Sequence, residues 1–210
     1  MIKKFKAFVF RMLIPFIRAE KLFEWFFYRR VSDKIRIIAG AGPTNFPGWF
    51  KTDIWYLDLT KRKDFLRYFR KTKIDNMLAE HVLEHIPSDQ ILLMLGCIRE
   101  FASPGFNFRV AVPDGFHADP EYVNAVKPGG HGCGSDDHKN LFDYKSISEL
   151  FAQKGFAAHP VEFWDENGQF HRGYENDDKG YISRSFINDD RNSNGKPVYT
   201  SLIVDFTLQK

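Results

Sequence analysis

Cysteine is scarce in this sequence, with only Cys97 and Cys133 among 210 residues. Two cysteines cannot supply the disulfide framework of a small secreted domain, so the sequence predicts a reducing, cytoplasmic environment. Long apolar runs are absent as well, and no stretch approaches the roughly 20 residues that span a bilayer. Arg11, Pro15 and Arg18 interrupt the N-terminal apolar residues, which argues against a signal peptide. The length suits one domain with a full core rather than two.

Charge of one sign is also in short supply, because the net charge at pH 7 is only +3. That value is too small to indicate a nucleic-acid partner. Residues 1–30 nevertheless hold eight Lys or Arg against two Glu, a net +6, and the remaining 180 residues carry −3. Seven Phe, Trp25 and Tyr28 lie in the same segment. We expect a helical segment over 1–30, followed by a single domain over 31–210. The segment either packs on the domain, which is the favoured interpretation, or makes peripheral contact with the inner face of a membrane.

Strand and helix patterns alternate after this segment and end in strands. Strands are expected over 34–42, 48–55, 56–60, 76–79, 108–114 and 197–209, and helices over 64–71, 88–105 and 146–156. Ser88 and Ser146 are the expected helix caps, with Gly155 just after the last helix. In the last strand, alternate residues from Val198 to Leu208 are expected to face the core. The polar residues 165–196 indicate a long hairpin or an ordered insertion. This order predicts an α/β fold with a doubly wound, mostly parallel sheet and an antiparallel strand near the C-terminus.

A glycine turn in the run IIAGAGPTNFPGWFKTDI, residues 37–54, is the most informative local feature. A strand that ends in Gly40 and Gly42 lets the chain turn sharply and brings bare backbone against a ligand. Asp53 then follows at the end of the next expected strand, where a carboxylate can accept both hydroxyls of a ribose. Asp53 comes 11 positions after Gly42, which is a short spacing for a nicotinamide enzyme, where it is roughly 20 residues.

The order of several motifs resembles a known family. Gly40-Ala41-Gly42-Pro43 is followed by Pro47-Gly48-Trp49, Asp53, Asp58-Leu59, AEHVLEHIP and VAVPD. Over about residues 35–156 this order is similar to class I S-adenosylmethionine (SAM)-dependent methyltransferases. More narrowly, it resembles a short bacterial subgroup with G-S-G-P, P-G-W, D-L and H-V-L-E-H-I motifs.

The resemblance implies a SAM-dependent methyltransferase with the following site. Gly40 and Gly42 would approach the methionine part of SAM, and Asp53 would bind the ribose. Asp58 and Leu59 would lie beside the adenine, and Glu80 and His81 would border the cofactor and the methyl acceptor. The chain departs from the family pattern at Ile38 and Thr44, where the family often has an acid or Asn and a third glycine. A non-catalytic nucleotide-binding protein of the same fold is therefore the alternative.

His81-Val82-Leu83-Glu84-His85 also matches the H-x-x-E-H motif of one class of zinc peptidase. On a helix the two histidines would share a face and could bind zinc. Pro87 leaves such a helix little room, so a strand over 76–79 followed by a loop is favoured. A metal site that also draws on the loop residues 131–138 is less favoured than a hydrogen-bonded histidine pair. No metal ligand is predicted.

Methyl transfer to a hydroxyl needs a general base, and His is the usual choice near neutral pH. The candidates, in order of preference, are His138, His85 and Asp114, while His81 and His117 are weaker candidates. Asp114 is included because it ends an expected strand at the edge of the sheet where ligands of such folds bind. The acceptor is predicted only as a small molecule, a glycan or a lipid-linked compound. The sequence does not indicate the oligomeric state.

Overall fold

The computed structural model describes residues 2–209, and from residue 12 onward it describes the side chains as well. Five α-helices and seven strands are present among these residues. The helices are α1 (Ile2–Val31), α2 (Arg62–Phe69), α3 (Ser88–Phe101), α4 (Pro120–Val126) and α5 (Tyr144–Ala152). The strands are β1 (Arg36–Ala39), β2 (Phe50–Lys51), β3 (Ile74–Glu80), β4 (Ala102–Pro113), β5 (Phe156–Trp164), β6 (Phe170–Arg172) and β7 (Ser201–Leu208). Short 3₁₀ helices occur at Leu83–His85, Ser135–Asp137 and Asp190–Asn192.

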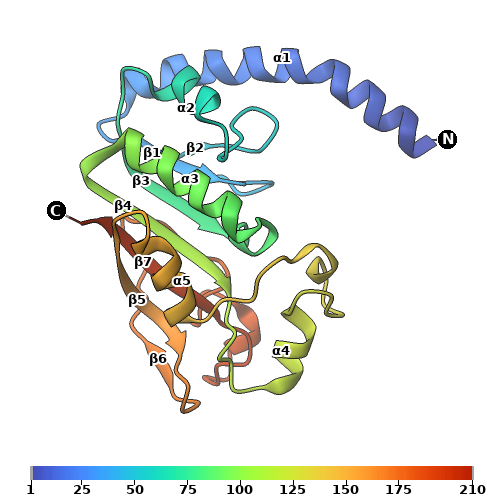
Figure 1. The fold of residues 1–210 in the computed structure, drawn as a ribbon, viewed down its shortest axis with the longest axis vertical. Coiled ribbons are helices and arrows are strands. Elements are labelled where there is room, and N and C mark those ends of the chain that lie inside the picture. The colour runs from blue at the N-terminus through green and yellow to red at the C-terminus, as the bar shows by residue number, and fades with distance from the viewer. Residues whose placement is uncertain (1, 210) are drawn as a thin grey trace.

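All seven strands form one sheet in the order β2-β1-β3-β4-β7-β5-β6 (Figure 1). The pairs β1–β2, β1–β3 and β3–β4 are parallel, whereas β7 is antiparallel to both β4 and β5. Five strands therefore point the same way, and only β7 and β6 oppose them. The predicted α/β fold, with a mostly parallel sheet and an antiparallel strand near the C-terminus, is confirmed.

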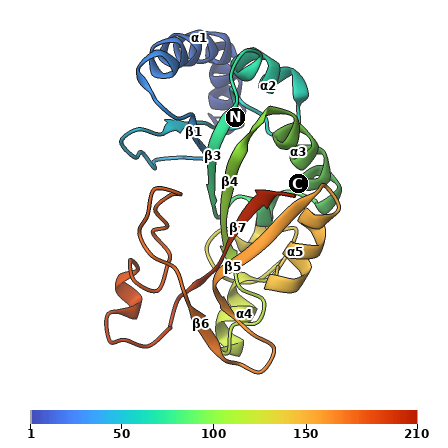
Figure 2. The ribbon, with the colours of Figure 1, turned by 90° about the vertical axis from the view of Figure 1, so that its left-hand side faces the viewer.

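Three helices cover one face of the sheet, as the edge-on view in Figure 2 shows. On this face the strands present alternate apolar residues, among them Ile37, Met77, Phe108 and Val204, which are fully buried. α2, α3 and α5 pack against them, and Phe151 of α5 stacks on Phe206 of β7 with ring centroids 3.7 Å apart. Burial of these side chains is the main source of stability for the layer.

Irregular chain covers the opposite face of the sheet. We call residues 173–200 the covering segment, and Figure 2 shows it on the side away from the helices. Its Tyr174 and Ile182 pack with Ile38, Leu78 and Ile203 of the sheet in a second apolar cluster. Because both faces of β7 are covered, its residues from Ser201 to Phe206 are all buried, and not only alternate ones. The strand begins at Ser201 and not at 197, and Val198, which was predicted to face the core, is 48% exposed.

A buried arginine ties the covering segment to the sheet. Arg109 of β4 is 2% exposed, and its guanidinium donates to both carboxylate oxygens of Asp205 on β7, at 2.8 and 2.9 Å. The same guanidinium donates to Asp177, at 2.6 Å, and to the carbonyl of Gly180, at 2.8 Å. Paired in this bidentate way, the buried charge is satisfied and fixes the register of the segment.

The long helix α1 crosses the molecule beside α2 and β2, and its N-terminal part projects beyond the body (Figure 1). Trp25 anchors it, with 3% exposure and edge-on ring contacts to Phe50 and Phe69. The predicted packing of this segment on the domain is thus present. None of the helices among residues 2–209 has both the length and the apolarity needed to cross a bilayer.

The outer face of α1 carries apolar side chains that nothing in the described chain covers. Phe16 is 73% exposed, Phe23 65% and Met12 62%. Phe26, Phe27 and Val31 continue the same stripe, and Arg30 lies over the ring of Phe26, 3.8 Å from its centroid. An aromatic stripe with cationic neighbours is a feature of helices that lie on membrane surfaces. Residues 2–11 belong to the helix, but their side chains lie outside the described part.

Several local expectations were wrong. Residues 56–60 form turns rather than a strand, because the N–H groups of Tyr56 and Leu57 both donate to the carbonyl of Asp53. β2 has only two residues and ends before Asp53. The helix expected over 88–105 ends at Phe101, since β4 begins at the next residue.

The predicted caps also differ in detail. Pro87 precedes α3 as its N-cap, and the hydroxyl of Ser88 donates to Asn140 instead. Asp143 caps α5, while Ser146 is the third helical residue and completes a capping box with it. Gly155 does adopt a left-handed conformation after this helix, with φ of +75°.

Candidate functional site

The site lies where the strand order reverses. β1 sits between β2 and β3, so the chain leaves β1 toward one side and returns on the other. Ligands of open α/β sheets bind in the crevice outside the carboxyl ends of the strands at such a point. The ends of β1 and β3 carry Gly40 and His81 respectively.

Gly40 and Gly42 make the predicted sharp turn, with φ of +58° and +50°. The N–H of Ala41 donates to the carbonyl of Thr52 at 2.8 Å, and the N–H of Thr52 donates to the carbonyl of Ile38 at 2.8 Å. These bonds hold the turn against the end of β2. A Cβ atom at position 40 would lie 2.7 Å from Cγ2 of Val82, so only glycine fits without displacing that side chain.

Two cavities meet at this turn. The first, which we call the glycine cavity, has about 290 Å³ and is lined by Gly40, Gly42, Glu80, His81 and Arg184 among others. The second, the Asp53 cavity, has about 520 Å³. Its lining includes Gly40, Asp53, Ile54, Leu57, Asp58, Leu59, His81, Val82, His85 and Ile86. Gly40 and His81 line both, so the two cavities adjoin, and we call them together the trough.

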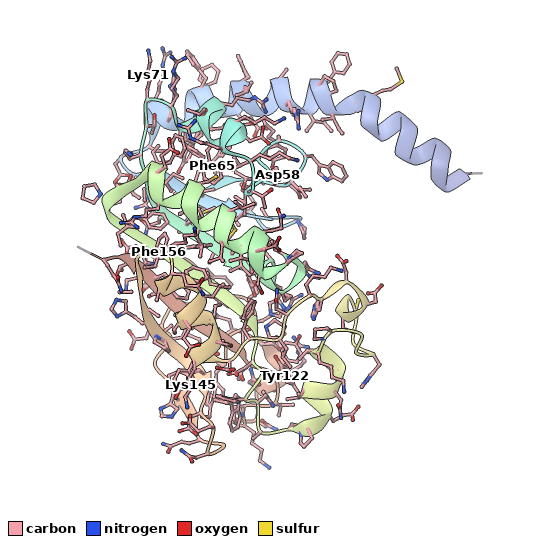
Figure 3. All side chains as sticks on the ribbon, in the orientation of Figure 1. Asp58, Phe65, Lys71, Tyr122, Lys145 and Phe156 are labelled. Carbon is pink, nitrogen blue, oxygen red and sulfur yellow. The ribbon has the colours of Figure 1, made fainter. Side chains whose placement is uncertain are left out.

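The structure therefore gathers all the residues predicted to bind the cofactor around this trough. Asp53 and Leu59 lie on the wall of one half, and Gly42 and Glu80 on the wall of the other. Asp58 also lines the trough and is labelled in Figure 3 near α2. Their individual contacts to a ligand stay predictions.

Two of these acids already have protein partners. The carboxylate of Glu80 accepts the N–H groups of Ser183 and Arg184, at 3.1 and 2.7 Å, which fastens the covering segment over the glycine cavity. The carboxylate of Asp58 accepts from Thr60 and Lys61. Burial raises the pKa of Asp58, but these hydrogen bonds outweigh it and lower the pKa below its usual value.

A third cavity, of about 600 Å³, opens beyond His81. We call it the histidine cavity, because His81, His85, His131 and His138 line it. The rest of its lining includes Glu84, Glu121, Tyr122, Arg184, Arg191 and Tyr199. Figure 3 labels Tyr122 on α4, at the opposite end of the site from Asp58. His81 lines all three cavities and so marks their junction.

His81 is held in an unusual conformation at this junction. Its φ of +52° is the only positive value at a non-glycine residue among those described. Such a conformation costs free energy and persists where the surroundings enforce it. Its N–H donates to the carbonyl of Ala111, and its Nε2 lies 3.1 Å from Oγ of Ser201. Nδ1 lies 3.1 Å from Oε1 of Glu84 without the geometry of a hydrogen bond.

The three predicted catalytic residues lie in different surroundings. His138 and His85 both face the histidine cavity, with ring centroids 4.8 Å apart. Asp114 is fully buried and is not among the residues that line the three cavities. Its two carboxylate oxygens accept the N–H groups of Phe116 and Trp164, at 3.0 and 2.8 Å. Burial raises the pKa of Asp114 to about 6, yet its contacts are those of a group that joins β4 to β5.

His117, a weaker candidate, is also part of the packing. Its ring stacks on Tyr122 with centroids 4.0 Å apart, and its Nδ1 accepts the N–H of Asp119. Burial lowers the pKa of His117 to about 4, so the ring is neutral over the physiological range.

The peptidase geometry is not present in the H-x-x-E-H motif. His81 ends a strand, and Leu83–His85 is a single turn of 3₁₀ helix. The two histidines therefore do not occupy successive turns of one α-helix face, as zinc peptidases of that type require.

Sequence reasoning missed the contribution of the covering segment. Arg184 lines both the glycine cavity and the histidine cavity, and Arg191 lines the latter. Tyr122 of α4 was missed as well, since a helix of only seven residues carries little signal in the sequence. The departure at Ile38 also has a packing cause, because this side chain is 3% exposed in the apolar cluster beneath the segment.

No protein-family model and no curated protein matches the sequence. Among solved structures, the chain is similar to LepI in complex with SAM, with 11% identity and a TM-score of 0.48. That match covers 91% of this chain but only 41% of LepI, so the chain spans less than half the length of that protein.

Two other similar structures are closer to this chain in length. A SAM-dependent methyltransferase from Archaeoglobus fulgidus matches with 11% identity, a TM-score of 0.46 and 94% of each chain covered. A magnesium protoporphyrin IX methyltransferase from Synechocystis PCC 6803, with bound S-adenosylhomocysteine (SAH), matches with 10% identity and a TM-score of 0.44. This match covers 95% of this chain and 83% of that one. Such identities and TM-scores assign the chain to no family.

Proposed function

We propose that the protein transfers a methyl group from SAM to an anionic small molecule, glycan or lipid-linked acceptor. One observation carries the proposal. One half of the trough contains the tight glycine turn, and the other half is lined by Asp53, Leu57 and Leu59. At His81 the trough meets the separate histidine cavity. A donor and an acceptor could thus meet at a single point.

The residues of the trough fit the chemistry of SAM. Asp53 would accept the hydroxyls of the ribose, and the apolar Ile54, Leu57 and Leu59 would contact the adenine. In the glycine cavity, Arg184 would pair with the carboxylate of the methionine part. Because the turn at Gly40 has no Cβ atom, the backbone can approach the ligand closely.

The chain itself would mainly position the acceptor. When bound, SAM supplies a methyl group activated by its sulfonium, so the displacement needs the acceptor atom in line at roughly 3–3.5 Å. The His81 junction is where the histidine cavity meets the trough. His85 and His138 would hold the acceptor oxygen there and accept its proton or assist its loss. The cationic Arg184 of the same cavity favours an acceptor with negative charge, whereas the guanidinium of Arg191 is already paired with Asp189.

We further propose that the outer stripe of α1 lies on an anionic membrane surface. Residues 1–30 carry a net +6, and the stripe around Phe16 and Phe23 is exposed. Exposed aromatic residues and positive charge together fit anionic lipid better than they fit an acidic protein surface. A lipid-linked acceptor would then be presented beside the site.

Titration calorimetry with SAH tests the proposed function. We expect micromolar binding by the unmodified protein and at least a tenfold weaker affinity for Asp53→Ala. The hydrogen bonds made by Asp53 in the turn use its backbone carbonyl, so the substitution leaves the turn intact. Asp178→Ala, which removes an exposed carboxylate near Lys34, is the control and should bind normally. Absence of binding by the unmodified protein would overturn the proposal.

A further inference from the structure

We propose that Glu84, His85 and His138 bind one divalent transition-metal ion in the histidine cavity. Each of the three offers one ligand atom, and these atoms lie within 4.8 Å of one another. All three side chains line the histidine cavity, so an ion among them would face the space assigned to the acceptor. The residues come from the 3₁₀ turn after β3 and from the loop that precedes α5.

The unpartnered carboxylate of Glu84 is the first observation that points to an ion. Glu84 is 1% exposed, and neither of its oxygens accepts a hydrogen bond among the described residues. Nδ1 of His81 lies 3.1 Å from Oε1 but without the geometry of a hydrogen bond, and Oε2 has no hydrogen bond among the described residues. A buried carboxylate without hydrogen bonds is strongly destabilising. Nδ1 of His85 is likewise buried without a hydrogen bond, and it lies 3.6 Å from Oδ2 of Asp137. A cation bound between these groups would supply a partner for the carboxylate of Glu84 and for the imidazole of His85.

The second observation is the orientation of His138. Its Nδ1 lies 2.6 Å from the carbonyl oxygen of Val126. A carbonyl can only accept, so Nδ1 carries the proton and Nε2 keeps its lone pair for a ligand. Imidazoles that bind metals usually donate their other N–H to a carbonyl or a carboxylate in this way, which fixes the tautomer and the ring orientation.

The backbone holds the two parts of the site together before any ion binds. The carbonyl of Glu84 accepts the N–H groups of Lys139 and Asn140, at 2.6 and 3.2 Å. The side-chain amide of Asn140 donates to the carbonyl of Ile86 at 2.7 Å. His138 directly precedes Lys139, so these hydrogen bonds hold it close to Glu84 and His85. Such preorganisation reduces the ordering that ligation requires.

Two imidazoles and one carboxylate select a transition-metal ion over Mg²⁺ or Ca²⁺, which prefer oxygen ligands. Zn²⁺ in catalytic sites commonly has three protein ligands of this kind and one open position. Bonds of about 2.0–2.2 Å would draw the three ligand atoms closer together than the 4.8 Å limit within which they lie without an ion. We therefore expect Zn²⁺, or an ion of similar size and preference, with an open position toward the cavity.

The role of this ion rests on the proposed function. An acceptor hydroxyl bound at the open position would have its pKa lowered, so it would lose its proton to solvent and become the nucleophile. The oxygen would then form a bond to the methyl carbon as the carbon–sulfur bond of SAM breaks, and SAH leaves as a neutral thioether. On this view His85 and His138 hold the acceptor oxygen through the ion and do not act as free bases.

This arrangement also differs from the peptidase use of H-x-x-E-H. Here Glu84 is a ligand, and the third ligand is His138 from a distant loop. His81 lies beside Glu84, with its Nε2 at Ser201. It is a positioning residue and not one of the three ligands.

The test is direct metal binding to the full-length protein after treatment with a chelator and dialysis. Calorimetry with Zn²⁺, and with Mg²⁺ as the oxygen-preferring comparison, should be done without SAM, and the retained metal measured by elemental analysis. We expect one Zn²⁺ per chain, no Mg²⁺ at the same concentrations, and at least tenfold weaker Zn²⁺ binding by His138→Ala and by Glu84→Gln.

His131→Ala is the matched control. His131 lines the same cavity but is 63% exposed and pairs with Glu121 at 3.0 Å, so its loss should leave Zn²⁺ binding unchanged. Circular dichroism of each variant shows that the fold is retained, and His85→Ala replaces any variant that does not fold. Absence of stoichiometric Zn²⁺, or equal binding by the His131 and His138 variants, would overturn the proposal. SAH binding is measured separately, so a metal-free protein that binds SAH refutes only the metal site, and a Zn²⁺ protein that does not bind SAH refutes only the function.

Discussion

At the scale of single residues, Gly40 and Gly42 allow two contributions to the free energy of unfolding to be separated. One is the strain of a left-handed backbone, and the other is the steric clash of an added Cβ atom. Both glycines have φ near +55°, but a Cβ atom at Gly42 would meet nothing within 4 Å, whereas one at Gly40 would lie 2.7 Å from Val82. A left-handed conformation costs an L-residue roughly 1–2 kcal/mol, and overpacking adds about 1–3 kcal/mol.

We expect Gly42→Ala to lower the free energy of unfolding by about 1–2 kcal/mol. Gly40→Ala should lower it by about 2–5 kcal/mol, because the clash is added to the strain. Urea denaturation of both variants measures the difference. Val82→Ala in the Gly40→Ala background should recover about 1 kcal/mol relative to additivity. Equal costs at the two glycines would show that Val82 moves aside freely.

Gly40, Gly42 and Asp53 could be predicted because they depend on local rules, whereas the other predicted residues of the trough followed only from the family resemblance. Gly40 and Gly42 end a strand, and Asp53 follows within the same unit of fold, so sequence order alone places them together. Asp114 met the same rule, yet its side chain turns inward to two backbone N–H groups. Arg184 follows no such rule, because it reaches the site from a polar segment about 100 residues away. The choice between an inward and an outward carboxylate is made by tertiary packing.

At the scale of elements, the inner face of α1 buries its apolar side chains against the domain, whereas the apolar side chains of its outer face are exposed. Trp25 is buried among the rings of Phe50 and Phe69, while Phe16 and Phe23 are 73% and 65% exposed. Transfer of one such ring from water to lipid is worth roughly 1.5–3 kcal/mol. Positive charge near the surface adds about 1 kcal/mol per Lys or Arg on anionic lipid.

We expect the protein to bind vesicles that contain phosphatidylglycerol, more weakly at high salt, and not vesicles of phosphatidylcholine alone. Co-sedimentation with such vesicles measures the binding. Phe16→Ser combined with Phe23→Ser should reduce it at least tenfold. Leu93→Ser is the control, since Leu93 is a 56%-exposed apolar residue on α3. Unchanged binding by the double variant would show that α1 does not insert its aromatic stripe.

The helices and strands themselves were predicted where their sequence is periodic or apolar. α3 and α5 bury one face each, and β4 and β7 contain short apolar stretches rich in Val, Phe and Leu, so their existence followed from the sequence. Apolar and polar residues alternate over 56–60. There, however, the carbonyl of Asp53 accepts the N–H groups of Tyr56 and Leu57, so the chain forms a turn instead of a strand. The covering segment has no period at all. Its position was unpredictable because it is fixed by long-range contacts such as Arg109 with Asp177.

At the scale of the whole molecule, Glu162 links pH to stability. It is fully buried on β5, and one of its oxygens accepts the N–H of Phe186 in the covering segment at 2.8 Å. Burial raises the pKa of Glu162 from 4.5 to about 8, although that hydrogen bond opposes the shift. The folded protein therefore binds this proton more tightly than the unfolded chain does, and stability falls as pH rises from about 4.5 to about 8.

Glu162→Gln should remove this part of the pH dependence. Relative to the unmodified protein, we expect the variant to gain up to about 4 kcal/mol at pH 8, since one pKa unit is worth about 1.4 kcal/mol. The gain should vanish near pH 5. Thermal denaturation of both proteins across this range measures it. Asp114, with a pKa of about 6, acts in the same direction. Its charge also helps to raise the pKa of Glu162, so the comparison includes the interaction between the two carboxylates. A gain independent of pH would contradict the assignment.

The position of β7 has a consequence for how the molecule is made. This strand lies between β4 and β5, which are bonded to each other only through it. During synthesis on a ribosome, the chain therefore emerges with β4 as an open edge, and neither half of the sheet can close on the other until residues 201–208 have left the exit tunnel. Any fragment that stops short of Ser201 leaves an unpaired apolar strand of the kind that chaperones bind and that aggregates when they do not.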